Sequence, residues 1–202
     1  MKNSKSISNK FKSINNVVIC ETDHLHLNSA HVRIKGKKKP REWIWAQRPG
    51  SKNKAVAIIP FIVDKKTGEE SIVLLKQFRI PVERYVYEFP AGLMDKKGES
   101  EIKVAERELF EETGLKIKKA VSKTPFGYTS PGMTDESICY VVAEVEGEIT
   151  NKNCGLLEDI EILCLNRQEA LRLIKEEQKG FDIKCWLWLS WFVSDVGDVK
   201  NI

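Results

Sequence analysis

The sequence predicts an α+β fold, and three observations support that prediction. Short runs of β-branched and aromatic residues recur along the chain, bounded by glycine, proline and charged residues, which is typical of strands. Three other segments show the apolar spacing or the capping residues of helices. Neither internal repeats nor a linker-like composition divides the 202 residues, which are enough to bury one core.

The composition argues against several classes of protein. The net charge of +4, from 33 Lys and Arg against 29 Asp and Glu, is too small to indicate nucleic-acid binding. No apolar run approaches the roughly 18 residues of a membrane span, and the lysine-rich start lacks the apolar core of a secretory signal. The five cysteines never form a C-x-x-C pair, which favours reduced thiols in a cytoplasmic protein over disulfides or zinc.

The sequence pattern of the N-terminal quarter of the chain predicts a hairpin arm. Residues 1–15 are polar and basic, and we expect a flexible tail there, with a second tail at residues 197–202. Residues 16–50 are expected to hold the N-terminal strands. These comprise an apolar run, an alternating strand, a turn with glycine and proline, and a return strand, at Val17–Cys20, His31–Ile34, Lys35–Pro40 and Glu42–Ala46.

Residues 51–196 are expected to form the main domain, and six further strands are predicted in it. Each is rich in β-branched or aromatic residues and is bounded by turn residues. They cover Ala55–Val63, Ser71–Phe78, Tyr85–Phe89, Val121–Phe126, Ser137–Val145 and Ile160–Leu165.

Three helices are predicted in the same domain. The first begins after the N-cap residue Ser100 and ends at Gly114, with an apolar stripe between them. The second covers Arg167–Lys179 and the third Ile183–Val193. The third helix carries three tryptophans, and the helical spacing of two of them favours core or dimer packing over a base-stacking platform. They are Trp186, Trp188 and Trp191.

The first helix carries three carboxylates on one face. Glu108, Glu111 and Glu112 stand at positions i, i+3 and i+4. Their mutual repulsion costs helix stability, and a bound hard cation would remove that cost. Oxygen ligands without His or Cys indicate Mg²⁺, with Mn²⁺ as an alternative metal. The other interpretation is a solvated acidic surface.

The three glutamates belong to a longer motif that resembles the Nudix box. It reads Glu99, seven residues, Arg107-Glu108-Leu109, one residue, Glu111-Glu112, one residue, Gly114-Leu115. The flanking segments look like the ADP-ribose pyrophosphatase branch of the Nudix hydrolases, and they are Lys76–Arg79, Glu88–Gly92 and Ser130–Glu136. One departure is the six residues between Gly92 and Glu99, where the family has five. The loop before the helix is therefore one residue longer.

This resemblance implies an α/β/α sandwich with a mixed sheet and Mg²⁺-dependent hydrolysis of ADP-ribose to AMP and ribose 5-phosphate. A close alternative is a pyrophosphatase for another nucleoside-diphosphate sugar, such as GDP-mannose. An alternative from another class is a non-catalytic Nudix domain that senses a nucleotide or binds RNA. Such domains usually lose carboxylates of the box, so the three retained glutamates favour the enzyme.

The resemblance also implies roles for residues around the box. Glu108 and Glu112 would be the principal metal ligands, helped by Glu111 and the carbonyl of Ala91. Arg107 would orient a carboxylate, and Glu99 could orient a group or touch substrate. The substrate side is expected to include the fork of Arg79 on the phosphates, together with Glu88 and Pro131.

The nucleotide site and the oligomer are implied in the same way. Trp43 would stack on adenine, with Arg48 as its polar neighbour, although Trp43 and Trp45 could also be ordinary strand residues. In relatives a second aromatic comes from the other subunit, and here His31 aligns with it. The N-terminal strands exchange across a dimer in those relatives, so the resemblance predicts a homodimer.

A glutamate on a loop after the box serves as general base in this branch. Glu158, just before the last predicted strand, fits that place, and Gly155 would permit the loop to move. Asp159 is the nearest substitute, and Glu161 and Glu136 are further alternatives.

Overall fold

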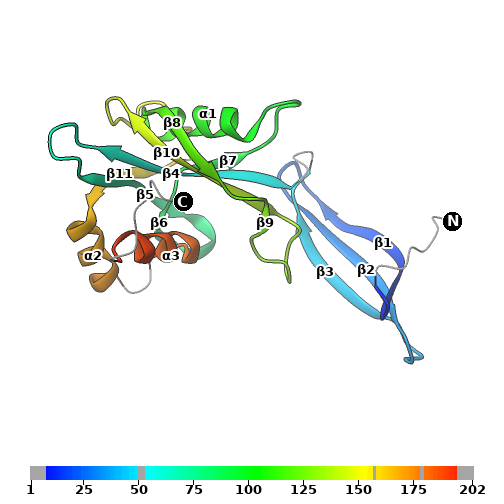
Figure 1. The fold of residues 1–202 in the computed structure, drawn as a ribbon. Coiled ribbons are helices and arrows are strands. Elements are labelled where there is room, and N and C mark those ends of the chain that lie inside the picture. The colour runs from blue at the N-terminus through cyan, green and yellow to red at the C-terminus, as the bar shows by residue number, and fades with distance from the viewer. Residues whose placement is uncertain (1–7, 50–52, 157, 178–179, 195–202) are drawn as a thin grey trace. The chain divides into compact units, whose positions relative to one another are not determined.

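The computed structural model describes residues 8–49, 53–156, 158–177 and 180–194, which form two compact units (Figure 1). The N-terminal unit contains the chain up to Lys54 together with Phe126–Ile138. The main unit contains Ala55–Pro125 and the chain from Cys139 onward. Compared with the predicted boundary after residue 50, the N-terminal unit extends to Lys54 and also includes a later segment of the chain. Residues 1–7 and 197–202, where tails were predicted, lie outside the described residues.

The N-terminal unit contains a separate three-stranded antiparallel sheet. Its strands are β1 (Phe11–Glu21), β2 (His26–Ile34) and β3 (Arg41–Gln47), in that order. The predicted hairpin is β2 and β3. The predicted tail was too long, because β1 begins at Phe11, which pairs with Ile34. Polar residues can form a strand when their backbone pairs with a neighbouring strand, so composition alone does not identify such a strand.

The segment Phe126–Ile138 is tied to the N-terminal strands by specific hydrogen bonds. The Ala46 backbone amide donates to the Met133 carbonyl at 2.9 Å. The side-chain amides of Gln47 and Asn53 both donate to the Asp135 carboxylate, at 2.6 and 3.0 Å. These contacts join positions more than 80 residues apart in the sequence, which a local pattern does not reveal.

An eight-stranded sheet forms the scaffold of the fold. Its main path runs β11-β5-β4-β10-β8, with β6 on β5, β7 on β4 and β9 on β10. A short 3₁₀ turn, Ile80–Val82, precedes β6. The strands are β4 (Lys54–Val63), β5 (Glu70–Arg79), β6 (Arg84–Glu88), β7 (Ala91–Leu93), β8 (Lys116–Lys123), β9 (Gly127–Tyr128), β10 (Ser137–Glu146) and β11 (Ile160–Asn166).

One strand prediction was wrong at both ends. The segment Val121–Phe126 was expected to be a strand, whereas β8 covers Lys116–Lys123. This strand lies at the end of the sheet order, and four of its eight residues are lysines. Lysines are common on edge strands, where they oppose pairing with another chain, and they obscure the apolar pattern.

Helices cover both faces of the sheet in the main unit (Figure 1). Helix α1 (Glu101–Thr113) lies on one face, and α2 (Arg167–Glu176) and α3 (Ile183–Phe192) lie on the other. Alternate residues of β4 serve the two cores, with Ile58 in the cluster of α1 and Ile59 in the cluster of α2 and α3. The predicted α/β/α arrangement and the α+β class with its mixed sheet are therefore confirmed.

The capping residues in the sequence predicted most of the helix ends correctly. The Ser100 hydroxyl accepts a hydrogen bond from the Lys103 amide, and Gly114 closes α1 with a φ of 74° that favours glycine. Helix α2 ends at Glu176, before the predicted end at residue 179. Trp188 and Trp191 pack against the core of the main unit, as predicted. Among the described residues, no helix is long and apolar enough to cross a membrane.

Candidate active site

The backbone of β7 lies directly against the acidic face of α1. A Cβ atom at Gly92 would stand 1.9 Å from the Glu108 carboxyl carbon, so the absence of a side chain there makes room for Glu108. The adjacent Ala91 amide donates a hydrogen bond to Glu112 Oε2 at 3.1 Å. A three-residue strand paired with β4 therefore holds two box carboxylates in place.

The three box glutamates are not equivalent. Glu112 is buried, with 5% of its surface exposed, and Glu108 is half-buried. Glu111 is exposed, and its carboxylate lies 3.5 Å from Arg107 Nη1. The i, i+3, i+4 spacing correctly places all three on one side of the helix, but only Glu108 and Glu112 face β7.

Arg107 is the centre of an ion-pair network. Its guanidinium donates to Glu108 at 2.5 Å, to Glu99 at 3.4 Å and to the Leu93 carbonyl at 3.3 Å. Partial burial favours loss of its proton, but the hydrogen bonds and charges of Glu99 and Glu108 raise the pKa of Arg107 above its ordinary value. This geometry is that of a residue which orients carboxylates, and Glu99 is one of those it holds.

Burial and mutual repulsion disfavour the charged forms of the box carboxylates. Burial is the main cause that raises the pKa of Glu112 to about 8, with further increases from the charges of Glu108, Glu158 and Glu88 and a decrease from the Ala91 amide. Burial also raises the pKa of Glu108, although Arg107 lowers it. The site therefore concentrates negative charge in a place where water compensates it poorly.

This charge distribution fits a divalent cation bound by oxygen ligands. A cation would offset the repulsion that raises both pKa values, and one buried oxygen of Glu99 has no hydrogen-bond partner in the described part of the chain. Within those residues, no group of three or more His, Cys, Asp and Glu side chains is arranged to hold a metal ion. A cation here would compete with Arg107 for Glu108.

Glu158 lies between β10 and β11 and acts electrostatically on the same carboxylates. Its charge contributes to the raised pKa of both Glu108 and Glu112. The Gly155 amide donates to Glu158 Oε2 at 2.6 Å. Gly155 thus contacts the carboxylate directly, a role that the sequence did not predict.

The alternative acids are engaged by other groups. Asp159 accepts a hydrogen bond from the Tyr85 hydroxyl at 2.6 Å, and Glu161 pairs with Lys76 at 3.1 Å. In the N-terminal unit, Glu136 pairs with Arg48 at 2.8 Å. Of the four acids considered from the sequence, Glu158 is the one whose charge acts on both Glu108 and Glu112.

Arg79 and Glu88 form an ion pair in the main unit. Arg79 Nε lies 2.8 Å from the Glu88 carboxylate, which is mostly buried. Burial raises the pKa of Glu88, and the opposite charge of Arg79 lowers it in part. Arg79 keeps about half of its side chain exposed, at 47%, so its fork is accessible to an anion.

The residues expected on the nucleotide side lie in the N-terminal unit. Trp43 is 58% exposed on β3, paired with Ala30, whereas His31 pairs with Glu42. Directly paired residues share a face of a sheet and neighbours alternate, so Trp43 and His31 lie on opposite faces. They cannot sandwich one base within a single chain. Pro131 lies in a turn in which the Ser130 carbonyl accepts from the Met133 and Thr134 amides.

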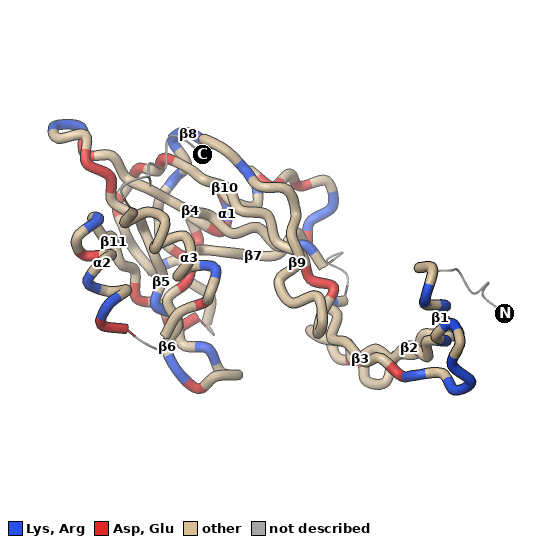
Figure 2. The backbone as a smooth tube through the Cα atoms, turned by 60° about the horizontal axis from the view of Figure 1, so that its bottom comes forward, with Lys and Arg blue, Asp and Glu red and all other residues tan. Residues whose placement is uncertain are grey.

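The tip of the N-terminal hairpin is basic. Figure 2 shows lysine and arginine gathered at the turn between β2 and β3, which corresponds to Lys35–Arg41 in the sequence. This segment is exposed throughout. Such a charge could steer an anionic substrate.

Three further features of the site were not predicted from the sequence. They are the contact of Gly92 with Glu108, the hydrogen bond of Tyr85 to Asp159, and the attachment of the Glu158 loop to the end of α1. The contact of Gly92 with Glu108 had one sequence signal, which was a glycine shortly before the acidic helix. The other two join segments that are distant in the sequence and carry no local signal.

Comparison with known proteins places the chain among enzymes of one kind. Residues 52–187 match the family profile described as "NUDIX domain". An ADP-ribose pyrophosphatase of Bacillus subtilis is 38% identical over 151 residues, which are 74% of this chain and 74% of that protein. An ADP-ribose pyrophosphatase of Saccharomyces cerevisiae is 35% identical over 154 residues, covering 72% of this chain and 66% of that protein.

A solved structure shares the fold. It is titled "Crystal structure of ADP compounds hydrolase", and it aligns with a TM-score of 0.65 at 21% identity, covering 94% of this chain and 97% of that one. At this identity the likeness supports the architecture.

Proposed function

Since the chain belongs to the Nudix family of hydrolases, we propose that it hydrolyses ADP-ribose to AMP and ribose 5-phosphate in a Mg²⁺-dependent reaction. The observation that carries this proposal is the meeting of Glu108 and Glu112 beside the backbone of β7, with the charge of Glu158 acting on both carboxylates. The choice of ADP-ribose is supported by the two ADP-ribose pyrophosphatases to which the chain is similar.

Each group has a role in this reaction. Glu108 and Glu112 would hold Mg²⁺, with Glu111 and the Ala91 carbonyl as further candidates. When bound, Mg²⁺ neutralises charge on the diphosphate and makes water more acidic. Glu158 accepts a proton from the water that attacks phosphorus, and the bridging P–O bond breaks to release AMP and ribose 5-phosphate. Arg107 orients Glu108 and Glu99, while Arg79, paired with Glu88, binds phosphate oxygens.

We expect a preference for ADP-ribose over GDP-mannose and over nucleoside triphosphates. Trp43→Ala should raise KM for ADP-ribose with a loss of roughly 1–3 kcal/mol, because base stacking on an aromatic ring is worth about that much. Ile183→Ala is a matched control, since Ile183 is an exposed apolar residue on α3 of the main unit and not on β3. AMP release across a substrate panel with Mg²⁺ measures both effects.

Equal kcat/KM for adenine and guanine substrates would contradict the expected preference. An unchanged KM in Trp43→Ala would remove Trp43 from the nucleotide site. Nucleotide binding by a wild-type protein that releases no phosphate product from any member of the panel would favour the sensing domain.

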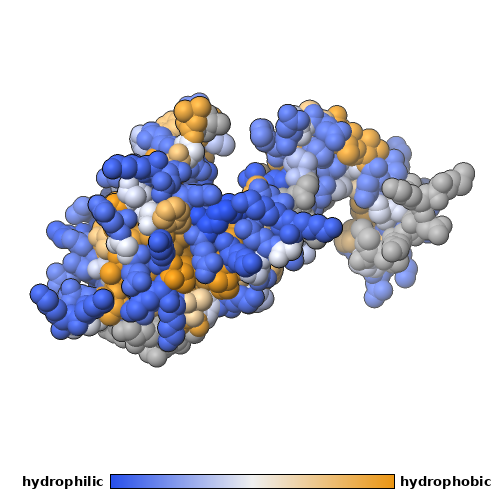
Figure 3. All heavy atoms as spheres, turned by 90° about the horizontal axis from the view of Figure 1, so that it is seen from above, coloured by the Kyte–Doolittle hydropathy of each residue, from blue (hydrophilic) through white to orange (hydrophobic). Residues whose placement is uncertain are grey.

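We also propose that the protein is a homodimer formed through the N-terminal strands. The three-stranded sheet exposes apolar side chains, and space-filling spheres show apolar groups at the surface of the molecule (Figure 3). Those of β1 and its neighbouring turn and strands are Val17, Val18, Ile19, Leu25, Leu27 and Ile44. Apolar side chains exposed on a sheet of this kind indicate an interaction surface, and a second chain that covers them would remove them from water.

Light scattering is expected to give twice the mass of the 23.1 kDa chain. The double variant Val17→Lys with Ile19→Lys should shift that mass toward the monomer. Leu187→Lys on α3 is the control, since Leu187 is similarly exposed, at 56%. A wild-type monomer at micromolar concentration would refute the dimer without bearing on the chemistry.

A further inference from the structure

We propose that Tyr85 is a positioning residue for Glu158 and that it acts through a hydrogen bond to Asp159. This inference rests on the proposed function, because it assigns Glu158 the role of base. It concerns the described residues between β10 and β11, 147–156 with Glu158 and Asp159, called the base loop below. Two separate parts of the main unit hold that loop, one near its middle and one at its end.

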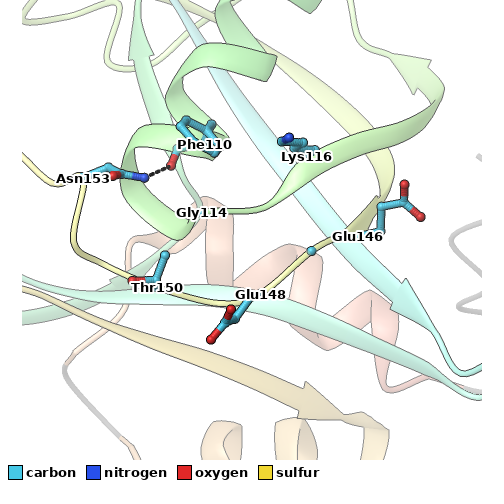
Figure 4. A pocket seen from close by; sticks show the side chains of 8 residues that line it. Phe110, Gly114, Lys116, Glu146, Glu148, Thr150 and Asn153 are labelled. Atoms are coloured by element: carbon cyan, nitrogen blue, oxygen red, sulfur yellow. Dashed lines mark hydrogen bonds between the residues drawn. The ribbon is translucent and has the colours of Figure 1, made fainter.

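The first anchor is the last turn of α1. The Thr113 carbonyl accepts from the Thr150 amide at 2.9 Å, and the Phe110 carbonyl accepts from the Asn153 side chain at 3.4 Å. Figure 4 shows Asn153 reaching from the base loop to this carbonyl, at the edge of a pocket of about 470 Å³. The Cys154 thiol lies 3.6 Å from the Glu112 carbonyl. The helix that carries Glu108 and Glu112 therefore also holds the first half of the base loop.

The second anchor is the pair of strands β5 and β6. The Asp159 carbonyl accepts from the Phe78 amide of β5 at 3.1 Å, and Asp159 Oδ2 accepts from the Tyr85 hydroxyl of β6 at 2.6 Å. Phe78 and Tyr85 are themselves paired in the sheet, with ring centroids 5.4 Å apart. The main chain and the side chain of Asp159 are thus both fixed by one rigid element.

Glu158 lies between these anchors, one peptide bond from Asp159. The hydrogen bond to its own carboxylate, from Gly155, is local to the base loop and does not fix the loop against the carboxylates of α1. The position of Glu158 relative to α1 is therefore set by the two anchors. Catalytic groups lose much of their effect when they are displaced by about 1 Å, so the Tyr85 hydrogen bond should show in kcat.

Tyr85→Phe removes the hydroxyl and leaves the ring on Phe78. We expect kcat for ADP-ribose to fall about tenfold with KM nearly unchanged. In the Glu158→Gln background the same substitution should cost no further activity, because Tyr85 acts through Glu158. Asp159→Ala should match Tyr85→Phe, and Asp159→Asn should retain most of kcat, since an amide oxygen still accepts the hydrogen bond. Tyr87→Phe on the same strand is the control and should behave as wild type.

Hydrogen exchange of a peptide covering residues 150–159 gives a readout that does not require turnover. Tyr85→Phe should speed exchange there, while the peptide of α1 stays protected. Unchanged exchange together with unchanged kcat in Tyr85→Phe would overturn the proposal. It would also be overturned if Tyr85→Phe lowered kcat by the same factor in the Glu158→Gln background as in the wild type. A wild-type protein that leaves ADP-ribose intact, with faster exchange still seen in Tyr85→Phe, would instead contradict the proposed function.

Discussion

Glu112→Gln is expected to remove most Mg²⁺-dependent turnover, by about a hundredfold or more, because charge stabilisation by a catalytic metal is worth several kcal/mol. The substitution keeps an oxygen that can accept the Ala91 amide hydrogen bond but loses the negative charge. The fold should survive, since Glu112 lies among carboxylates that repel it. AMP release from ADP-ribose measures the loss, and near-normal turnover would remove Glu112 from the ligand set.

The same variant should be more stable than wild type without metal at pH 8. The pKa of Glu112 is about 8 in the folded chain, raised from the value of 4.5 that an unfolded glutamate has. Between those values the folded state holds the proton more tightly, so this group's contribution to stability falls as pH rises from 4.5 to 8. Glutamine does not titrate and lacks this dependence.

Thermal melts in chelator at pH 5 and pH 8 provide the measurement. The wild-type melting temperature should fall more than that of Glu112→Gln over this interval. Glu106→Gln is the matched control, because Glu106 is exposed on the same helix and should leave the pH dependence as in wild type. Parallel pH dependences in wild type and Glu112→Gln would mean that Glu112 does not carry the raised pKa.

The local parts of the fold could be predicted from the sequence because their causes are local. The N-cap Ser100, the terminal Gly114 and the apolar stripe between them fixed α1 to within a residue. Hairpin turns placed β2 against β3 and β4 against β5 for the same reason. The motif from Glu99 to Leu115 occupies the end of the loop before α1, α1 itself and the two residues after it, so all of its glutamates lie on one continuous segment.

Features that depend on long-range pairing were not predicted. The later segment Phe126–Ile138 joins the N-terminal strands through contacts such as the hydrogen bond from the Ala46 amide to the Met133 carbonyl, and the sequence near residue 46 does not indicate that partner. The distinction between buried Glu112 and exposed Glu111 depends on where β7 lies, which helix spacing alone does not specify. Choosing among the loop acids likewise required the positions of Tyr85 and Lys76 on the sheet.

Glu158→Gln should lower kcat for ADP-ribose by a factor of about 10²–10⁴, which is the usual contribution of a general base to the rate. Glutamine keeps the length of the side chain and can still accept the Gly155 amide hydrogen bond, so the base loop should stay in place. KM and the Mg²⁺ concentration for half-maximal rate should change little. The reason is that a base acts on the attacking water, whereas Glu108 and Glu112 are the residues proposed to hold the metal.

The matched control is Glu161→Gln, three residues later in the chain. That carboxylate pairs with Lys76 on the exposed side of β11, so its loss should leave kcat within about twofold of wild type, as is usual for exposed ion pairs. Steady-state rates over a Mg²⁺ series separate the possible roles. A large rise in the Mg²⁺ requirement of Glu158→Gln would make Glu158 a metal ligand. Unchanged rates in Glu158→Gln with a collapse in Glu161→Gln would transfer the role of base to Glu161.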